Sequence, residues 1–228
     1  MSDKFPAFDV DYDFAVGEPA APDIQFYAGF GKRALDLLIA TLVLPVVLPI
    51  LALVWIVGQL IGGQPFFGQE RVGRHGETFR CYKVRTMVRD ADRVLLDLIE
   101  RDEEVAAEWH KFQKLRRDPR VTRWGHFLRK TSIDELPQIF NVLRGDMSIV
   151  GPRPFMTRQL DLYRAGGGHR YFSLRPGITG EWQVIGRGET SFVERVRFDN
   201  AYWEKLTLWH DVRLILGTVG ALAKRTGH

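Results

Sequence analysis

The chain has 228 residues, a length that suits one domain of ordinary size with appendages. Its single cysteine, Cys81, excludes an intramolecular disulfide, and its six histidines lack the spacing of a zinc site. The net charge of +4 combines an acidic start with a basic remainder. Residues 1–29 hold six acids and one base, which leaves 31 basic and 22 acidic residues in 30–228. A basic body suits an anionic partner such as a lipid head group, a nucleotide diphosphate or nucleic acid.

Residues 1–29 predict a disordered acidic tail. The segment has scattered acids and several prolines and glycines, and it lacks the basic start and apolar core of a signal peptide. We expect residues 30–62 to form a membrane helix and residues 63–228 to form a separate domain.

The stretch Leu37–Val57 contains 21 residues without a charge, long enough for a transmembrane helix. Pro45 and Pro49 lie in its middle, where each removes a backbone hydrogen bond and favours a break. Basic residues flank the run on both sides, and basic flanks tend to remain cytoplasmic. The pattern predicts a re-entrant helix that enters one leaflet, bends at the prolines and returns; a kinked spanning helix is the alternative. We expect Asp36 to pair with Lys32 and Arg33 at helical spacing.

The remaining sequence predicts a small α+β domain, mainly helical. Loose alternation over Glu77–Thr86 predicts a strand that places Lys83 and Arg85 on one face, either as phosphate contacts or as the solvated face of an edge strand. Apolar periodicity near 3.6 predicts the helices. These are Ala91–Leu115, Leu136–Leu143, Gln159–Arg164, Ser191–Tyr202 and Leu206–Leu222.

Two adjacent carboxylates, Asp134 and Glu135, precede Pro137, which fits only at the start of a helix or outside one. Arg129 lies before this dyad, and Arg153 follows it in a stiff Gly-Pro-Arg-Pro turn. Carboxylates, a helix N-terminus and guanidiniums in one segment suit chemistry on a phosphate. The structural alternatives are a capping box from Ser132 to Glu135, or Asp134 as the N-cap.

Two glycine-rich turns follow, at 175–180 and 186–188, in which backbone N–H groups can approach a diphosphate closely. Arg175 and Arg187 are candidate phosphate contacts there; tight turns with exposed arginines are the alternative. The last two helices carry tryptophans beside cations, a pattern typical of helices at a membrane interface. Core packing explains about half of their apolar positions equally well.

An ordered series of motifs resembles the bacterial sugar transferase family, the monotopic phosphoglycosyl transferases. The resemblance runs from about Gly31 to the C-terminus. Its motifs are Lys32-Arg-x-x-Asp36, Pro65-Phe-Phe-Gly-Gln-Glu-Arg-Val-Gly73, Tyr82-Lys-Val-Arg-Thr-Met87, Asp118-Pro-Arg-Val-Thr122, Gly125-His-Phe-Leu-Arg-Lys130, the dyad, Gly151-Pro-Arg-Pro154, Arg175-Pro-Gly-Ile-Thr-Gly180 and Trp182-Gln-Val-Ile-Gly-Arg187.

The resemblance implies transfer of a hexose-1-phosphate, glucose or galactose, from a UDP-hexose to undecaprenyl phosphate, with release of UMP. This would be the first membrane step of exopolysaccharide synthesis, on the cytoplasmic face of the bacterial inner membrane and in contact with its lipids. Asp134 would attack the β-phosphorus to give an aspartyl-phosphosugar. Asp134 and Glu135 would serve Mg²⁺, the expected cofactor, and Lys83, Arg85, Arg129, Arg153, Arg175 and Arg187 would bind substrate phosphates.

Two other classes remain open at this point. A basic membrane-associated module would bind a nucleotide sugar or an anionic lipid without releasing UMP. Nucleic-acid modules interleave aromatic residues with cations on one face, whereas the cations here cluster at turns, so we expect no nucleic-acid partner. A homodimer is an open alternative to a monomer.

Overall fold

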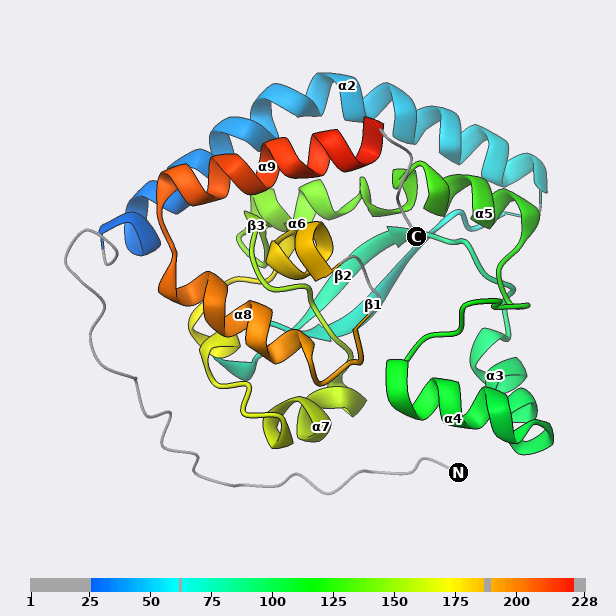
Figure 1. The fold of residues 1–228 in the computed structure, drawn as a ribbon. Coiled ribbons are helices and arrows are strands. Elements are labelled where there is room, and N and C mark those ends of the chain that lie inside the picture. The colour runs from blue at the N-terminus through cyan, green and yellow to red at the C-terminus, as the bar shows by residue number, and fades with distance from the viewer. Residues whose placement is uncertain (1–25, 62, 187–189, 224–228) are drawn as a thin grey trace.

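The structure is a computed structural model, and it describes residues 26–61, 63–186 and 190–223. Helices dominate these residues, and the strands form two small sheets, so the predicted α+β class with mainly helical content is confirmed (Figure 1). The helices are α2 (Lys32–Ile61), α3 (Ala91–Arg101), α4 (Glu103–Phe112), α5 (Arg123–Lys130), α6 (Gln138–Arg144), α7 (Leu160–Ala165), α8 (Arg195–Glu204) and α9 (Leu208–Ala223); the strands are β1 (Phe66–Val72), β2 (Thr78–Val84), β3 (Ser148–Val150) and β4 (Gly177–Thr179).

Helix α2 is assigned without interruption over 30 residues, with both Pro45 and Pro49 inside it. Figure 1 shows α2 running along one side of the domain above α9 and α6. One stripe of α2 is buried, including Ala40 and Val54, while most of its remaining large apolar side chains are exposed. The prolines therefore do not divide the chain into two separate helices, and the re-entrant topology stays a prediction. The segment Tyr27–Ile61 is long and apolar enough to cross a membrane.

The start of the helical region lies before the predicted boundary. A π-helical turn, Tyr27–Gly31, leads directly into α2, so residues 26–29 are helical and the predicted tail 1–29 is four residues too long. The rest of that tail lies outside the described residues.

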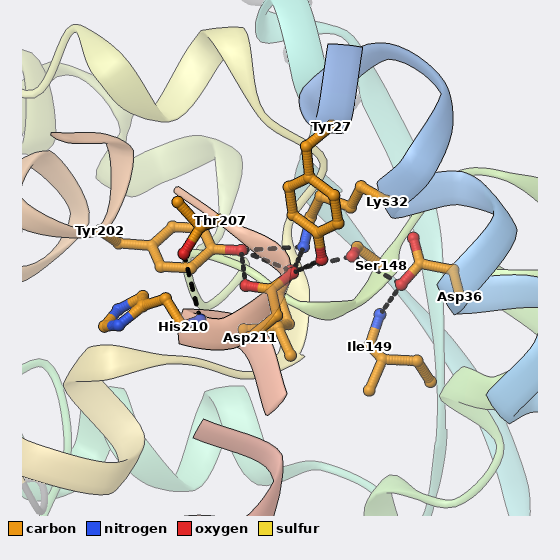
Figure 2. A network of polar contacts seen from close by, with 10 residues as sticks. Tyr27, Lys32, Asp36, Ser148, Ile149, Tyr202, Thr207, His210 and Asp211 are labelled. Atoms are coloured by element: carbon orange, nitrogen blue, oxygen red, sulfur yellow. Dashed lines mark hydrogen bonds and ion pairs between the residues drawn. The ribbon is translucent and has the colours of Figure 1, made fainter. Parts of the chain in front are cut away.

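A buried polar network ties the N-terminal end of α2 to the domain (Figure 2). The Lys32 ammonium donates to Asp211 of α9 at 2.6 Å and to the Tyr202 hydroxyl of α8 at 2.8 Å. Asp36 accepts from the Ser148 hydroxyl at 2.9 Å and from the backbone N–H of Ile149 at 2.8 Å. The expected pairing is found only in part. Lys32 lies close enough for its charge to favour ionised Asp36, but its ion pair is with Asp211, and Arg33 donates to backbone carbonyls of α6 instead. Asp36 Oδ2 is buried without a hydrogen-bond partner among the described residues.

Strands β1 and β2 form an antiparallel hairpin against which α6 packs. The buried side chain of Asn141 in α6 joins the two elements: it accepts from the N–H of Tyr82 at 2.9 Å and donates to the carbonyl of Arg80 at 2.8 Å. A side chain thus supplies the polar partners that a further strand would otherwise give to β2. The predicted strand Glu77–Thr86 is confirmed as β2, whereas β1 was not predicted.

The second sheet pairs β3 with β4 in parallel. Both strands have three residues; β4 lies in the segment 175–180 that the sequence indicated as a turn, and β3 immediately precedes the Gly-Pro-Arg-Pro turn. A Cβ atom on Gly177 would lie 2.1 Å from the backbone nitrogen of Gly151, so the two turns approach too closely for any side chain.

The predicted helix Ala91–Leu115 is two helices. Asp102 has an extended backbone and caps α4 by accepting from the N–H groups of Glu104 and Val105, which ends α3 at Arg101. The apolar positions of the C-terminal helices divide as expected. Phe192, Leu206 and Leu214 are buried, whereas Leu208, Trp209, Leu216 and Val219 are exposed.

Candidate active site

The dyad lies on a single 3₁₀ turn, Ile133–Glu135, and α6 begins three residues after it at Gln138. Ser132 adopts a left-handed conformation (φ 55°, ψ 17°), and its side chain makes no capping hydrogen bond. Pro137 occupies the N-cap position of α6 without a side-chain cap. Neither structural alternative for the dyad is found, because the Glu135 side chain points to cations and not back to the backbone of Ser132.

Glu135 is held by two cations. Its carboxylate accepts both terminal nitrogens of Arg153, with 3.2 Å from Nη1 to Oε2, and it accepts Lys83 Nζ at 3.0 Å on Oε1. Only 17% of the Glu135 side chain is exposed. Burial alone would raise the pKa of Glu135, but Arg153 and Lys83 outweigh it and hold that pKa well below the usual range. Glu135 is therefore a permanent anion at neutral pH.

Asp134 has the opposite electrostatic character. The residue is buried, and burial raises the pKa of its carboxyl group. The charge of Glu135 raises it further, while Lys83, Arg153 and Arg129 oppose the shift. No hydrogen bond to its carboxylate is found among the described residues, so Asp134 is a poorly solvated carboxylate without fixed partners. Such a group is a better nucleophile than one engaged in a salt bridge.

Arg129 reaches the dyad from the last turn of α5. A Cβ atom on Gly125 would lie 1.9 Å from the carbonyl oxygen of Thr86, so only glycine allows α5 to approach the end of β2 this closely. Arg129 Nε donates to the Thr86 hydroxyl at 3.0 Å. Burial lowers the pKa of Arg129, and the nearby carboxylate of Asp134 opposes this shift. Within the described part of the chain its terminal nitrogens have no hydrogen-bond acceptor, which leaves them available to an anion.

A small cavity adjoins Glu135, and it brings in two residues that the sequence analysis did not select. Gln138 is buried at the start of α6. Arg71, from β1, donates to the Pro154 carbonyl at 3.4 Å and to the Gln69 side chain at 2.6 Å, and burial lowers its pKa to about 10. The motif around Arg71 was recognised, but a lone arginine in a strand gave no local signal of proximity to the dyad. The cavity is lined by Arg71, Lys83, Glu135, Gln138, Arg153 and Pro154.

The other predicted phosphate ligands are not gathered at the dyad. Arg85 donates to the Gln64 carbonyl at 3.2 Å and lies over the ring of Phe67. Arg175 donates to the carbonyl of Gly145, just beyond the opposite end of α6. Arg187 lies outside the described residues. The structure thus brings Lys83, Arg129 and Arg153 to the dyad, and phosphate binding by Arg85, Arg175 and Arg187 remains a prediction.

The donor set suits magnesium only in combination with a substrate. No group of three or more His, Cys, Asp or Glu side chains suited to a metal occurs in the described part of the chain. Mg²⁺ commonly binds one or two carboxylates together with substrate phosphates and water. Glu135 Oε2 accepts one hydrogen bond and retains a lone pair, and Asp134 has no fixed partner. The two carboxylates therefore fit a magnesium ion that arrives with a diphosphate.

Comparison with known proteins gives a consistent result. The chain matches the family described as bacterial sugar transferase over residues 27–225. It is 46% identical over 198 residues to the UDP-galactose-lipid carrier transferase of Erwinia amylovora, which covers 87% of this chain and 41% of that protein. It is 42% identical over 205 residues to the exopolysaccharide production protein ExoY of Sinorhizobium fredii, which covers 90% of each.

A third relative is the UDP-glucose:undecaprenyl-phosphate glucose-1-phosphate transferase of Escherichia coli, 39% identical over 197 residues, covering 82% of this chain and 39% of that protein. The chain thus spans about two fifths of the length of several relatives that it matches and nine tenths of ExoY. Because the family match covers most of the 228 residues and all of the site described above, the chain belongs to the bacterial sugar transferase family.

Proposed function

We propose that this protein transfers a hexose-1-phosphate, glucose or galactose, from a UDP-hexose to undecaprenyl phosphate and releases UMP. The observation that carries the proposal is the difference between the surroundings of the two carboxylates. Glu135 forms ion pairs with Arg153 and Lys83, while the buried Asp134 beside it has no fixed partner. Two adjacent carboxylates with such different environments suit two different roles in one reaction. Relatives named for galactose and for glucose transfer support the reaction class and leave the hexose open.

The proposed reaction has two displacements at one phosphorus. An Asp134 carboxylate oxygen attacks the β-phosphorus of the UDP-hexose, the bond from that phosphorus to the bridging oxygen breaks, and UMP leaves. A phosphate oxygen of undecaprenyl phosphate then attacks the same phosphorus and releases the Asp134 carboxylate. Arg129, which lies beside Asp134, would neutralise the charge that develops on the transferring phosphoryl group.

We also propose Mg²⁺ as a cofactor that would bind together with the substrate diphosphate, with Glu135 and Asp134 as the residues that would hold it. The ion would supply positive charge to the diphosphate. Lys83 and Arg153 keep Glu135 ionised, which a metal ligand requires.

A one-leaflet attachment on the cytoplasmic face of the inner membrane completes the proposal. Both ends of α2 pack on the same domain: Lys32 pairs with Asp211, and Val54 belongs to a cluster with Val84 and Leu128. A straight span would separate these two ends by the thickness of the bilayer. Contacts of both ends with one charged domain therefore favour a helix that stays on one side.

The decisive assay is UMP release by the purified full chain from UDP-glucose and from UDP-galactose, with and without undecaprenyl phosphate. We expect turnover with lipid acceptor and one preferred sugar, and loss of turnover in Asp134→Asn. Saturable binding of a UDP-hexose or of anionic lipid, without any UMP from either sugar, would instead identify a binding module. Exposed Arg197→Lys serves as the matched control for handling of the membrane protein.

A further inference from the structure

In the turn that carries Arg153, every backbone carbonyl oxygen from residue 152 to residue 155 accepts a hydrogen bond. Two of the four donors are backbone N–H groups of other strands or turns, and two are arginine side chains, Arg71 and Arg195. The pairs are Gly177 N to Pro152 O at 2.8 Å, Arg195 Nη2 to Arg153 O, Arg71 Nη1 to Pro154 O at 3.4 Å, and Val72 N to Phe155 O at 2.9 Å.

Arg195 is a buried cation in an unusual setting. It comes from the first turn of α8, and only 2% of the residue is exposed. Its ion-pair partner is Asp199, whose Oδ2 lies 3.5 Å from Arg195 Nε without forming a hydrogen bond to it and accepts the Tyr163 hydroxyl at 2.7 Å. Four aromatic rings surround the guanidinium at 5.1–5.6 Å from their centroids: Phe155, Tyr163, Trp182 and Phe192.

Burying the charged guanidinium of Arg195 lowers the free energy of unfolding unless other interactions offset the lost hydration. Burying a charge requires a partner and hydrogen bonds to offset lost hydration, and well-packed apolar residues often stabilise a core as well or better. A purely structural role would not require a planar donor, because an apolar side chain would fill the space between the rings. The guanidinium does something that an apolar residue cannot: it binds the backbone of Arg153 while stacking on the ring of Phe155, two residues further along.

We propose that Arg195, oriented by Asp199, is a positioning residue that fixes Arg153 for the reaction. The backbone carbonyl of Arg153 is bound by Arg195, and its guanidinium is bound to Glu135. Arg195 does not contact the dyad, so it acts through Arg153. The expected loss of kcat in an Arg195 variant rests on the proposed function. The hydrogen bond from Arg195 to the Arg153 carbonyl does not depend on that function.

The kinetic test uses Arg195→Lys, which keeps the charge but loses the planar fork, with the exposed Arg197→Lys on the same helix as control. We expect kcat for UMP release to fall about 10- to 100-fold, with little change in KM for the UDP-hexose, because the defect misplaces a group that acts in the transition state. In an Arg153→Lys background the same substitution should have almost no further effect. Additive losses, or an unchanged kcat, would overturn the proposal.

The activity-independent test is hydrogen exchange followed by mass spectrometry on peptides covering 149–156. We expect faster exchange of this segment in Arg195→Lys than in the wild type or in Arg197→Lys, and unchanged exchange would overturn the proposal. If Arg195→Lys does not fold, Asp199→Asn carries both tests; if neither variant folds, Arg195 is only structural and the proposal fails. A wild type that releases no UMP would refute the proposed function, while the exchange experiment would still test the hold on the turn.

Discussion

The two carboxylates of the dyad should contribute to stability with opposite signs. Glu135→Ala removes the carboxylate that binds the half-buried Arg153 and Lys83, and only the charge of Asp134 remains near them. Removing one partner of a buried ion pair costs about 3–5 kcal/mol, and the partial exposure of this pair places its cost at the low end, about 3 kcal/mol. Asp134→Asn removes a charge whose burial raises its pKa, so the folded state loses a desolvation cost and should change by less than about 1 kcal/mol, in the stabilising direction.

These free energies predict separable melting temperatures. A domain of this size shifts by roughly 2–4 °C per kcal/mol, so thermal unfolding in detergent should show Glu135→Ala lower by about 6–12 °C and Asp134→Asn unchanged or slightly higher. Asn retains the shape of Asp and Gln retains the shape of Glu, so Glu135→Gln measured beside Asp134→Asn separates the effect of each charge from the loss of side-chain volume. Near-equal destabilisation by changes at the two positions would refute the assignment of unequal roles.

The pH dependence provides a second check on Glu135. Its folded-state pKa lies below the ordinary value of 4.5, so its stabilising contribution is complete above pH 4.5 and is lost as the pH falls toward the folded-state pKa. The difference in melting temperature between wild type and Glu135→Gln should therefore be constant near neutrality and shrink below pH 4.5. A difference that grew on acidification would contradict this sign.

Three further predictions concern activity and topology. Because burial raises the pKa of Asp134 in the free enzyme, the acid limb of the pH–kcat/KM profile should lie above the ordinary value of 3.8, and a limb below it would argue against Asp134 as the ionising nucleophile. Arg129→Ala should reduce kcat for UMP release by about 100-fold or more, whereas Arg85→Ala, whose contacts lie with Gln64 and Phe67, should reduce it far less. Equal losses would place both arginines, or neither, at the reacting phosphate. A cysteine replacing the exposed Phe26 should resist an impermeant reagent added outside spheroplasts, and its labelling from outside would mean that α2 spans the bilayer.

Much of the site could be predicted because its elements carry local signals. Pro137 marks the start of a helix, so the dyad had to lie just before α6. Alternation along β2 placed Lys83 on a definite face, and the Gly-Pro-Arg-Pro turn identified Arg153. Each signal depends on backbone chemistry within a few residues, which sequence patterns report well.

The features that were missed depend on contacts distant in sequence. Lys32 and Asp211 are 179 residues apart, and nothing near Lys32 indicates that partner. Strands of three residues such as β3 and β4 are too short for periodicity to reveal, and they exist because glycine lets two turns approach. Nothing in the local sequence singles out Arg195; only the fold shows that aromatic rings enclose it.

A quenched reaction without the lipid acceptor tests the central claim most directly. The full chain would be incubated with UDP-hexose and Mg²⁺, denatured in acid, and analysed for UMP and for peptide masses. The account predicts at most about one UMP per enzyme and a hexose-phosphate adduct on the peptide that contains Asp134, with neither product in Asp134→Asn. A strict requirement for undecaprenyl phosphate before any UMP appears, with no adduct on the enzyme, would contradict it and show direct transfer between the two substrates.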